Sequence, residues 1–194
     1  MRYILASGSP RRKELLSKVL KEFEIIPAQG DETTDNVRPN DMVEELSFKK
    51  ASEIFHKIFS EDGEMPVVIG ADTVVSYNYR ILGKPKDRVE ARKMISSLQG
   101  DEHTVFTGVT VFYGKDGKEE HFSFSEETLV YVTSMTDEEV EAYLSTGEAD
   151  DKAGAYGVQG DFGKFINGIR GDYYNVVGLP IARLYREMKK RGLL

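Results

Sequence analysis

The chain has 194 residues, no cysteine and a formal net charge of −7. The lack of cysteine excludes disulfides and Cys-ligated zinc or iron–sulfur sites, and the negative charge argues against a general nucleic-acid surface. An acidic protein still binds an anion where its few cations converge. The apolar runs are too short for a signal peptide or a membrane span. We therefore expect a cytoplasmic protein that binds neither a nucleic-acid polymer nor a membrane.

The first predicted elements are a strand, a helix and a second strand. An apolar strand at 3–6 leads directly into a helix, in which Ser9 is a natural N-cap and Pro10 suits the first helical position. Leucine and valine then recur at helical spacing as far as residue 20. A second strand is predicted at 23–27.

The middle of the chain predicts a long helix, a buried strand and a shorter helix. Asn40 or Asp41 caps the long helix, which ends before a turn at 60–66. The nearly continuous apolar run at 67–75 is typical of a buried strand, and a further helix is predicted over 87–100. One face of the long helix carries an apolar stripe, formed by Val43, Leu46, Ala51, Ile54 and Ile58.

A β-rich insertion follows. The segments 104–113 and 118–133 flank a hairpin signal at 114–117. Thr136 with Glu139 three residues later forms a capping box. We therefore expect a β-hairpin followed by a short helix.

The last part of the chain opens with a glycine-rich stretch at 151–160, whose composition is too specific for a linker. Short strands are predicted at 162–166 and 173–177, and Pro180 starts the last helix. The fold class is α/β, a mixed twisted sheet with flanking helices, and we expect a single domain over 1–194.

Two arginines stand in the first turn of the first helix, where the partial positive charge of a helix N-terminus disfavours cations. Arg11 and Arg12 are either solvated or part of an anion site. In the second interpretation a phosphate lies on the N-terminal amides, and the hydroxyls of Ser7 and Ser9 contribute to its binding. The arginines then add forked hydrogen bonds to the phosphate oxygens.

Two further charged residues interrupt apolar patterns. Lys50 falls within the apolar stripe of the long helix, where a lysine either extends to the surface or reaches into a cleft beside an anion. Asp72 interrupts the predicted buried strand, where a carboxylate either caps a turn or serves a functional cleft.

The remaining candidates are in loops. Lys84 lies between a glycine and a proline that fix the backbone, and Lys152 lies in the glycine-rich stretch. Glu32 is in a polar loop and, taken alone, would be solvated. Asp72 and Glu32 are acids suited to hold Mg²⁺ or Mn²⁺. A polyphosphate ligand fits these acids together with five cations at fixed positions, namely Arg11, Arg12, Lys50, Lys84 and Lys152.

Six motifs, in one order and over almost the whole chain, resemble those of the Maf family. Each motif alone is weak, and their combination is highly specific. They are ASGSPRR at 6–12, Lys50-Ala51, GADTVV at 70–75, LGKP at 82–85, DKAGAYGVQG at 151–160 and GDYYNVVGLP at 171–180.

This resemblance implies an elongated, two-lobed fold with a deep central cleft, related to the inosine-triphosphatase group. It implies hydrolysis of a nucleoside triphosphate to the monophosphate and pyrophosphate with a divalent metal cation. The SPRR start and the DKAGAYGVQG loop look like the branch of the family that acts on dTTP and UTP. The resemblance also suggests a homodimer, removal of modified pyrimidine nucleotides, and a link to arrest of septum formation and cell division.

The resemblance also assigns roles to single positions. Asp72 matches the family's proton acceptor, and Arg12, Thr73 and Gln159 match positions linked to substrate specificity. The polar positions of the family's cleft are matched by Ser7, Arg11, Glu32, Lys50, Lys84 and Lys152.

Two alternatives to this function remain open. The first is a non-catalytic, nucleotide-binding regulator of septum formation, which loss of Asp72 would have favoured; Asp72 is present. The second keeps the reaction and changes the base to methylated purine triphosphates or to a pool of damaged nucleotides.

Overall fold

The described part of the chain, residues 1–63 and 65–194 of a computed structural model, contains a seven-stranded mixed sheet. Neighbouring strands run in the order β2-β1-β3-β5-β6-β7, and β4 pairs with β3. The pairs β1–β2 and β1–β3 are parallel, whereas β3–β4 and β6–β7 are antiparallel. The strands are β1 (Tyr3–Leu5), β2 (Glu24–Ile25), β3 (Val67–Tyr77), β4 (Arg80–Leu82), β5 (Glu102–Lys115), β6 (Lys118–Val132) and β7 (Ile166–Arg170).

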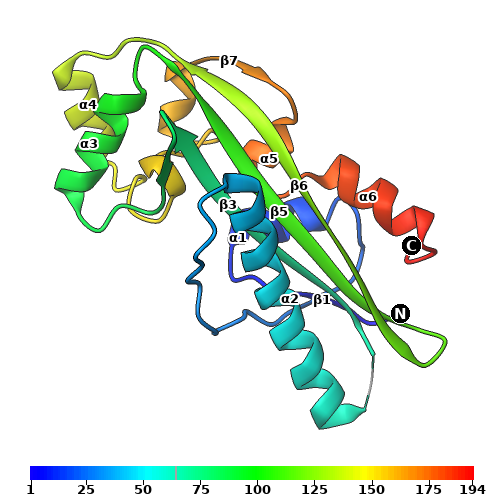
Figure 1. Cartoon of the computed structure of the whole chain (residues 1–194). Coiled ribbons are helices and arrows are strands. Elements are labelled where there is room, and N and C mark those ends of the chain that lie inside the picture. Colours follow the sequence, from blue (N-terminus) through cyan, green and yellow to red (C-terminus); the bar gives the residue numbers. More distant parts are fainter. Residues whose placement is uncertain (64) are drawn as a thin grey trace. The chain divides into compact units, whose positions relative to one another are not determined.

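Helices alternate with these strands, as the sequence predicts for the α/β class (Figure 1). Two of the predicted caps are confirmed: the Ser9 hydroxyl accepts from the Arg12 amide, and Thr136 and Glu139 form a capping box. The α-helices are α1 (Pro10–Leu16), α2 (Pro39–Asp62), α3 (Arg88–Leu98), α4 (Asp137–Leu144), α5 (Tyr173–Val177) and α6 (Ile181–Lys190), and the 3₁₀ helices are η1 (Ala153–Ala155) and η2 (Asp161–Phe165).

The contacts within the chain divide it into two compact units. The first unit comprises Met1–Asp72, Thr107–Glu126 and Gly178–Leu194. The second unit comprises Thr73–Phe106 and Glu127–Val177. Asp72 is therefore the last residue that β3 contributes to the first unit, and Thr73 is the first that it contributes to the second.

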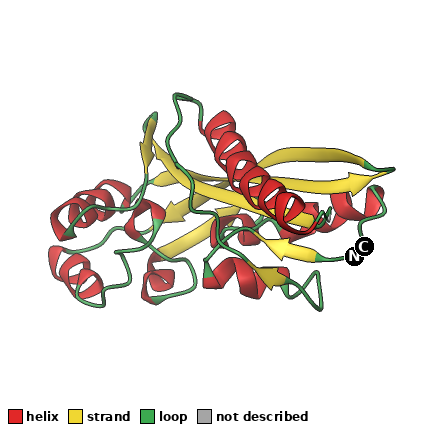
Figure 2. Ribbon diagram, turned by 90° about the horizontal axis from the view of Figure 1, so that it is seen from below, coloured by secondary structure: helices red, strands yellow, loops and turns green. Residues whose placement is uncertain are grey.

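In the first unit, the long helix α2 lies over strands of the sheet (Figure 2), and side chains of its apolar stripe pack against them. All five residues of the predicted stripe are buried, so that prediction is confirmed. Ile54 and Phe55 of α2 share a core cluster with Ile4 of β1 and Phe112 of β5. Burial of such side chains is the main source of stability for this unit.

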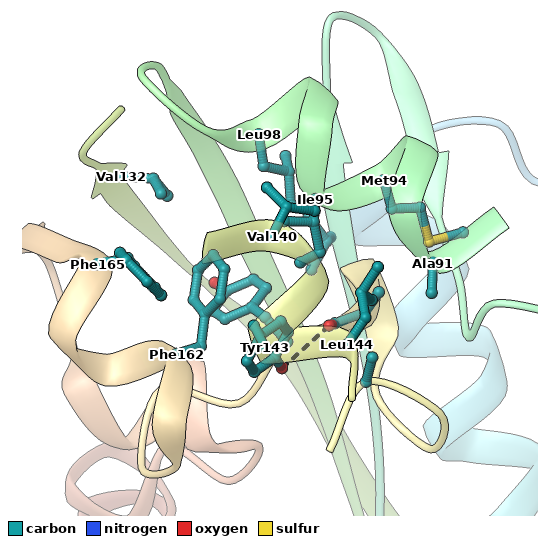
Figure 3. Close-up of a cluster of buried hydrophobic side chains, with 14 of the residues drawn as sticks. Ala91, Met94, Ile95, Leu98, Val132, Val140, Tyr143, Leu144, Phe162 and Phe165 are labelled. Atoms are coloured by element: carbon teal, nitrogen blue, oxygen red, sulfur yellow. Dashed lines mark hydrogen bonds between the residues drawn. The ribbon is translucent and has the colours of Figure 1, made fainter. Parts of the chain in front are cut away.

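The core of the second unit is built by α3, α4 and aromatic residues that follow them in the chain (Figure 3). Ile95 and Leu98 of α3 meet Val140 of α4 in this cluster. Tyr143 packs against Phe162 with ring centroids 5.0 Å apart. The core therefore reaches from α3 to the segment that follows the glycine-rich stretch.

Two predicted strands are wrong. Residues 173–177 form α5, because Asp172 accepts the Tyr174 amide and the side-chain amide of Asn175 donates to Val105 O and Thr128 Oγ1. These tertiary contacts override the β-propensity of the tyrosines and valines.

Residues 161–165 form η2, and the strand β7 begins only at Ile166. The spacing of Phe162 and Phe165 directs both rings into the core from one turn of 3₁₀ helix.

The start of α2 also differs from the prediction. Neither Asn40 nor Asp41 caps the helix, which begins at Pro39 after Arg38. Proline suits a first helical position, and Arg38 instead pairs with Asp41 at 2.6 Å. The helix continues to residue 62, beyond the predicted start of a turn at 60–66, and residue 64 lies outside the described residues.

Candidate active site

The centre of the candidate site in the first unit is the ion pair between Lys50 of α2 and Asp72 of β3. Lys50 Nζ lies 2.6 Å from Asp72 Oδ1 and 3.0 Å from Glu32 Oε1. The side chains of Lys50 and Asp72 are only 13% and 12% exposed. Lys50 therefore does not extend to the surface: one nearly buried ammonium bridges two carboxylates.

A glycine allows this contact, because α2 crosses β3 at short range. A Cβ atom on Gly70 would lie 2.4 Å from the Ser47 carbonyl oxygen and 2.8 Å from the Ala51 amide of α2. Only glycine permits so close an approach of the two backbones. The first residue of the GADTVV motif thus brings Lys50, which precedes Ala51, to Asp72.

The loop before α1 and the first turn of that helix are fixed by Arg12. Arg12 Nε donates to the Gly178 carbonyl at 2.9 Å, and Nη1 donates to Ser7 Oγ at 3.3 Å. Ser7 Oγ also accepts the Ser9 amide at 3.3 Å. Arg12 is therefore not a solvated side chain, and the hydroxyls at 7 and 9 lie where the helix begins.

Burial and neighbouring charges shift the pKa of Arg12. Desolvation by burial lowers the pKa of its guanidinium, and the negative charge of Asp72 opposes that shift. The charges of Arg11, which is half-buried, and of Glu32 also act on it. Two arginines and two carboxylates of the predicted set are thus electrostatically coupled within the first unit.

Glu32 belongs to a polar loop that one glutamate of α2 holds in place. Glu53 accepts the Gln29 and Gly30 amides, each at 2.9 Å. A cavity of about 410 Å³ lies between this loop and α2. It is lined by Ala28, Gly30, Asp31, Glu32, Leu46, Phe48, Lys49, Lys50, Ser52 and Glu53.

The carboxylates of Glu32 and Asp72 fit a hard divalent cation. Both have an oxygen within 3.0 Å of the same Lys50 nitrogen, so they converge on one position that already holds a positive charge. No cluster of three or more acidic or histidine side chains suited to a metal occurs in residues 1–63 and 65–194. Mg²⁺ commonly binds through one or two carboxylates and completes its coordination with substrate phosphates and water.

The remaining predicted residues lie in the second unit. Thr73 is half-buried on β3, whereas Lys84 and Gln159 are exposed. The Gly154 amide donates to the Gly83 carbonyl at 3.0 Å. This bond joins the LGKP motif, which carries Lys84, to the glycine-rich loop 151–160.

Lys152 stands at the start of this loop. Its ammonium donates to the Glu148 carbonyl and to Asp151 Oδ1, both at 2.7 Å. The Tyr143 hydroxyl donates to the Ala155 carbonyl at 3.1 Å, and the Tyr156 hydroxyl lies 2.7 Å from His103 Nε2. The loop is therefore tied at several points to the core of the second unit.

Sequence reasoning missed several residues that hold these segments. They are Glu53, His103 and Glu148, and each looks like an ordinary charged or packing residue in the sequence. The spacing of three between Lys50 and Glu53 places both on one helix face, which is the only local signal for Glu53. The close glycines at 157 and 160 are the corresponding signal for Glu148.

A family model described as Maf-like protein matches residues 2–191. The chain belongs to this family. This Maf-like chain is 48% identical to a protein of Agathobacter rectalis over 98% of its own length and 97% of that protein's. It is 47% identical to a protein of Bacillus cytotoxicus, with 97% and 95% covered. Both relatives are named dTTP/UTP pyrophosphatase.

Among solved structures, the Maf-like chain matches a nucleoside-triphosphatase / dITP/XTP pyrophosphatase from Mycobacterium abscessus with a TM-score of 0.38 and 13% identity. The match covers 100% of this chain and 97% of the other. Within the described residues, each helix is too short or too polar to cross a membrane.

Proposed function

We propose that the chain hydrolyses dTTP and UTP to the monophosphate and pyrophosphate. The observation that carries this proposal is the nearly buried Asp72 carboxylate, fixed by Lys50 at 2.6 Å and electrostatically coupled to Arg12. A carboxylate so placed among cations suits proton transfer beside a polyanion. The relatives named dTTP/UTP pyrophosphatase, 46–48% identical over nearly the whole chain, support the substrate class.

The proposed step is the attack of water on the α-phosphorus. The water oxygen bonds to that phosphorus while the bond from the phosphorus to the α,β-bridging oxygen breaks, so that pyrophosphate leaves with the bridging oxygen. Asp72 accepts the proton that the water loses. Lys50 holds the carboxylate by its Oδ1 atom and so fixes the position of the base.

Negative charge grows on the leaving pyrophosphate, and fixed cations stabilise it in the transition state. Arg11, Arg12 and the hydroxyls of Ser7 and Ser9 would bind the phosphates at the start of α1. Lys50, Lys84 and Lys152 would neutralise further charge. A Mg²⁺ or Mn²⁺ ion held by Glu32 and Asp72 would act as a Lewis acid on the phosphate oxygens.

Base selection is assigned to Arg12, Thr73 and Gln159. The amide of Gln159 has both a donor and an acceptor, which match the O4 and N3–H groups that uracil and thymine share. Cytosine presents a donor and an acceptor in the opposite order at these positions. An amide fixed in one orientation therefore discriminates against CTP.

The test is pyrophosphate release from dTTP, UTP, CTP, dATP, GTP and 7-methyl-GTP with Mg²⁺ or Mn²⁺. Asp72→Asn is expected to reduce kcat for dTTP and UTP by about a hundredfold or more, the usual loss of a general base. The matched control is Asp116→Asn in the exposed β5–β6 turn, where asparagine also tolerates the φ of 51°. Cleavage without loss in Asp72→Asn would contradict the assigned role.

Other outcomes of the panel separate the alternatives. Binding of nucleotides without cleavage by the wild type would favour a regulator of septum formation. Preference for 7-methyl-GTP would move the activity to another branch of the family. The homodimer that the family resemblance suggests is tested separately, by light scattering on the purified chain.

A further inference from the structure

The glycine-rich loop ends in a tight turn that presents Gln159. The Gly160 amide donates to the Gly157 carbonyl at 3.2 Å, so Val158 and Gln159 are the central residues of the turn. Gln159 is exposed, whereas Val158 packs against the core of the second unit. The backbone of this turn therefore sets the position of Cα and Cβ of Gln159, from which the amide extends.

One carboxylate lies against both ends of the turn. Glu148 Oε2 accepts the Asp161 amide at 2.7 Å, directly after Gly160. A Cβ atom on Gly160 would lie 2.2 Å from both oxygens of Glu148, and one on Gly157 would lie 2.7 Å from Oε1. The carboxylate thus fills the space that side chains at 157 and 160 would occupy.

At these two positions side-chain atoms of Glu148 occupy the space of a Cβ atom, and no left-handed φ calls for glycine. Neither has a positive φ, and Gly160 has a φ of −99°, which any residue adopts. The lack of a side chain at 157 and 160 therefore leaves room for the Glu148 carboxylate, whereas the φ angles there do not favour glycine. At these two positions the glycines of DKAGAYGVQG lie against Glu148, which is outside the motif, and Gly157 also lies against Lys152, which is within it.

Glu148 also contacts the other candidate of the loop. Its carbonyl accepts the Lys152 ammonium at 2.7 Å. Its Oε1 atom is buried and has no hydrogen-bond partner within the part of the chain that the structure describes. An acceptor buried without a donor costs stability, and proteins tolerate such costs mainly at functional sites.

We propose that Glu148 is a positioning residue for base selection: its carboxylate fixes the turn 157–160 and thereby the direction of the Gln159 amide. This inference rests on the proposed function. A fixed amide meets the base without first losing conformational freedom. Without the carboxylate, the turn has room to relax and the amide offers donor and acceptor to any base.

The experiment measures kcat/KM for UTP, dTTP and CTP in the wild type and in three variants. Glu148→Ala removes the carboxylate, and Glu148→Gln keeps an oxygen for the Asp161 amide. Asp150→Ala is the control, because it removes an exposed carboxylate from the same segment. The ratio of UTP to CTP is the decisive quantity, because partial unfolding lowers both values by the same factor and leaves their ratio unchanged.

Glu148→Ala is expected to lower the UTP/CTP ratio by about tenfold, the worth of one well-placed hydrogen bond. Glu148→Gln is expected to retain most of the ratio, and Asp150→Ala all of it. If the wild type prefers UTP to CTP and Glu148→Ala keeps the same ratio, this inference is wrong and the proposed function still stands. A wild type that cleaves no triphosphate would overturn the proposed function, and the inference with it.

A second set of variants keeps the test decisive if Glu148→Ala folds poorly. Gly160→Ala places a Cβ atom against the carboxylate and is expected to lower the UTP/CTP ratio similarly. In the double variant Glu148→Ala/Gly160→Ala the clash is absent, so the ratio should be no lower than in Glu148→Ala. If the UTP/CTP ratio of the double variant fell by the product of the two single losses, the two positions would act separately. That result contradicts the inference.

Discussion

Two loops carry candidate site residues, and a glutamate holds each of them in a different way. In the first unit, both oxygens of Glu53 accept backbone amides at 2.9 Å, from Gln29 and Gly30. In the second unit, Glu148 accepts the Asp161 amide with one oxygen, while the other is buried without a donor in the described part of the chain.

The difference separates the tasks of the two loops. Glu53 is half-exposed and fully paired, so its hydrogen bonds contribute to the stability of the loop that carries Glu32. Glu148 is half-satisfied and lies against the turn that carries Gln159. Under the proposed function, Glu53 acts on the loop with the candidate metal ligand Glu32, which serves every triphosphate, and Glu148 acts on the turn that carries Gln159, which serves the choice of base. Changes in the first unit should therefore alter the rate, and changes around Glu148 the selectivity.

The largest expected effect lies at the centre of the first unit. Lys50→Met removes the ammonium that joins Asp72 to Glu32, and the loss of such a group in a water-poor site lowers kcat/KM by about 10²–10³-fold. UTP, dTTP and CTP should lose the same factor, as initial rates of pyrophosphate release would show. Lys57→Met, at an exposed position of α2, is the control. A loss confined to UTP and dTTP would contradict the expectation that Lys50 affects the rate with every triphosphate equally.

The second prediction concerns stability and pH in the second unit. His103 is buried against the Tyr156 hydroxyl, and desolvation lowers its pKa to about 4, although the charge of Asp101 opposes this shift. The unfolded chain takes up this proton near pH 6.5, whereas the folded chain does so only near pH 4. Stability is therefore lost as the pH falls through this window, by at most about 3 kcal/mol.

Urea unfolding of the wild type and of His103→Gln at pH 7, 6 and 5 checks this. Glutamine keeps a hydrogen-bonding group near Tyr156 and does not titrate, so the extra loss of stability at low pH should disappear. The exposed His121 in the first unit provides the control His121→Gln. If the free energy of unfolding fell equally with pH in the wild type and in His103→Gln, His103 would not titrate as predicted.

Most elements of the fold were predictable where the signal is local, although the local cap signal at Asn40 or Asp41 was wrong. The caps at Ser9 and Thr136, the hairpin at 114–117 and the buried run in β3 depend on neighbouring residues, and the structure agrees with them. The segment 173–177 was not predictable, because Asn175 is held by Val105 and Thr128, far away in the sequence.

The same limit applies to the candidate site. The unusual setting of Lys50 and Asp72 is visible in the sequence, because each interrupts an apolar pattern. Their pairing, and the convergence of Glu32 on the same nitrogen, depend on how α2 crosses β3. Glu148 by itself looks like a solvated glutamate in a charged loop, and its only signal in the sequence is the pair of close glycines at 157 and 160.

The smallest effect, and the sharpest test of the comparison, is expected at Glu53. Glu53→Ala removes the two hydrogen bonds that hold the loop before Glu32, so the loop loses order and the candidate metal ligand is less well placed. We expect kcat/KM to fall by about tenfold. The Mg²⁺ concentration for half-maximal rate should rise, because Glu32 must then be ordered when the ion binds.

Steady-state rates over a Mg²⁺ titration, with UTP and CTP in parallel, measure both changes. Glu61→Ala, at the exposed end of α2, is the control for loss of a helical glutamate. The UTP/CTP ratio should stay constant in Glu53→Ala, whereas it falls in Glu148→Ala. If both glutamates changed the ratio, the two loops would act on the base together. If neither did, the buried oxygen of Glu148 would be a structural cost without a role in selection.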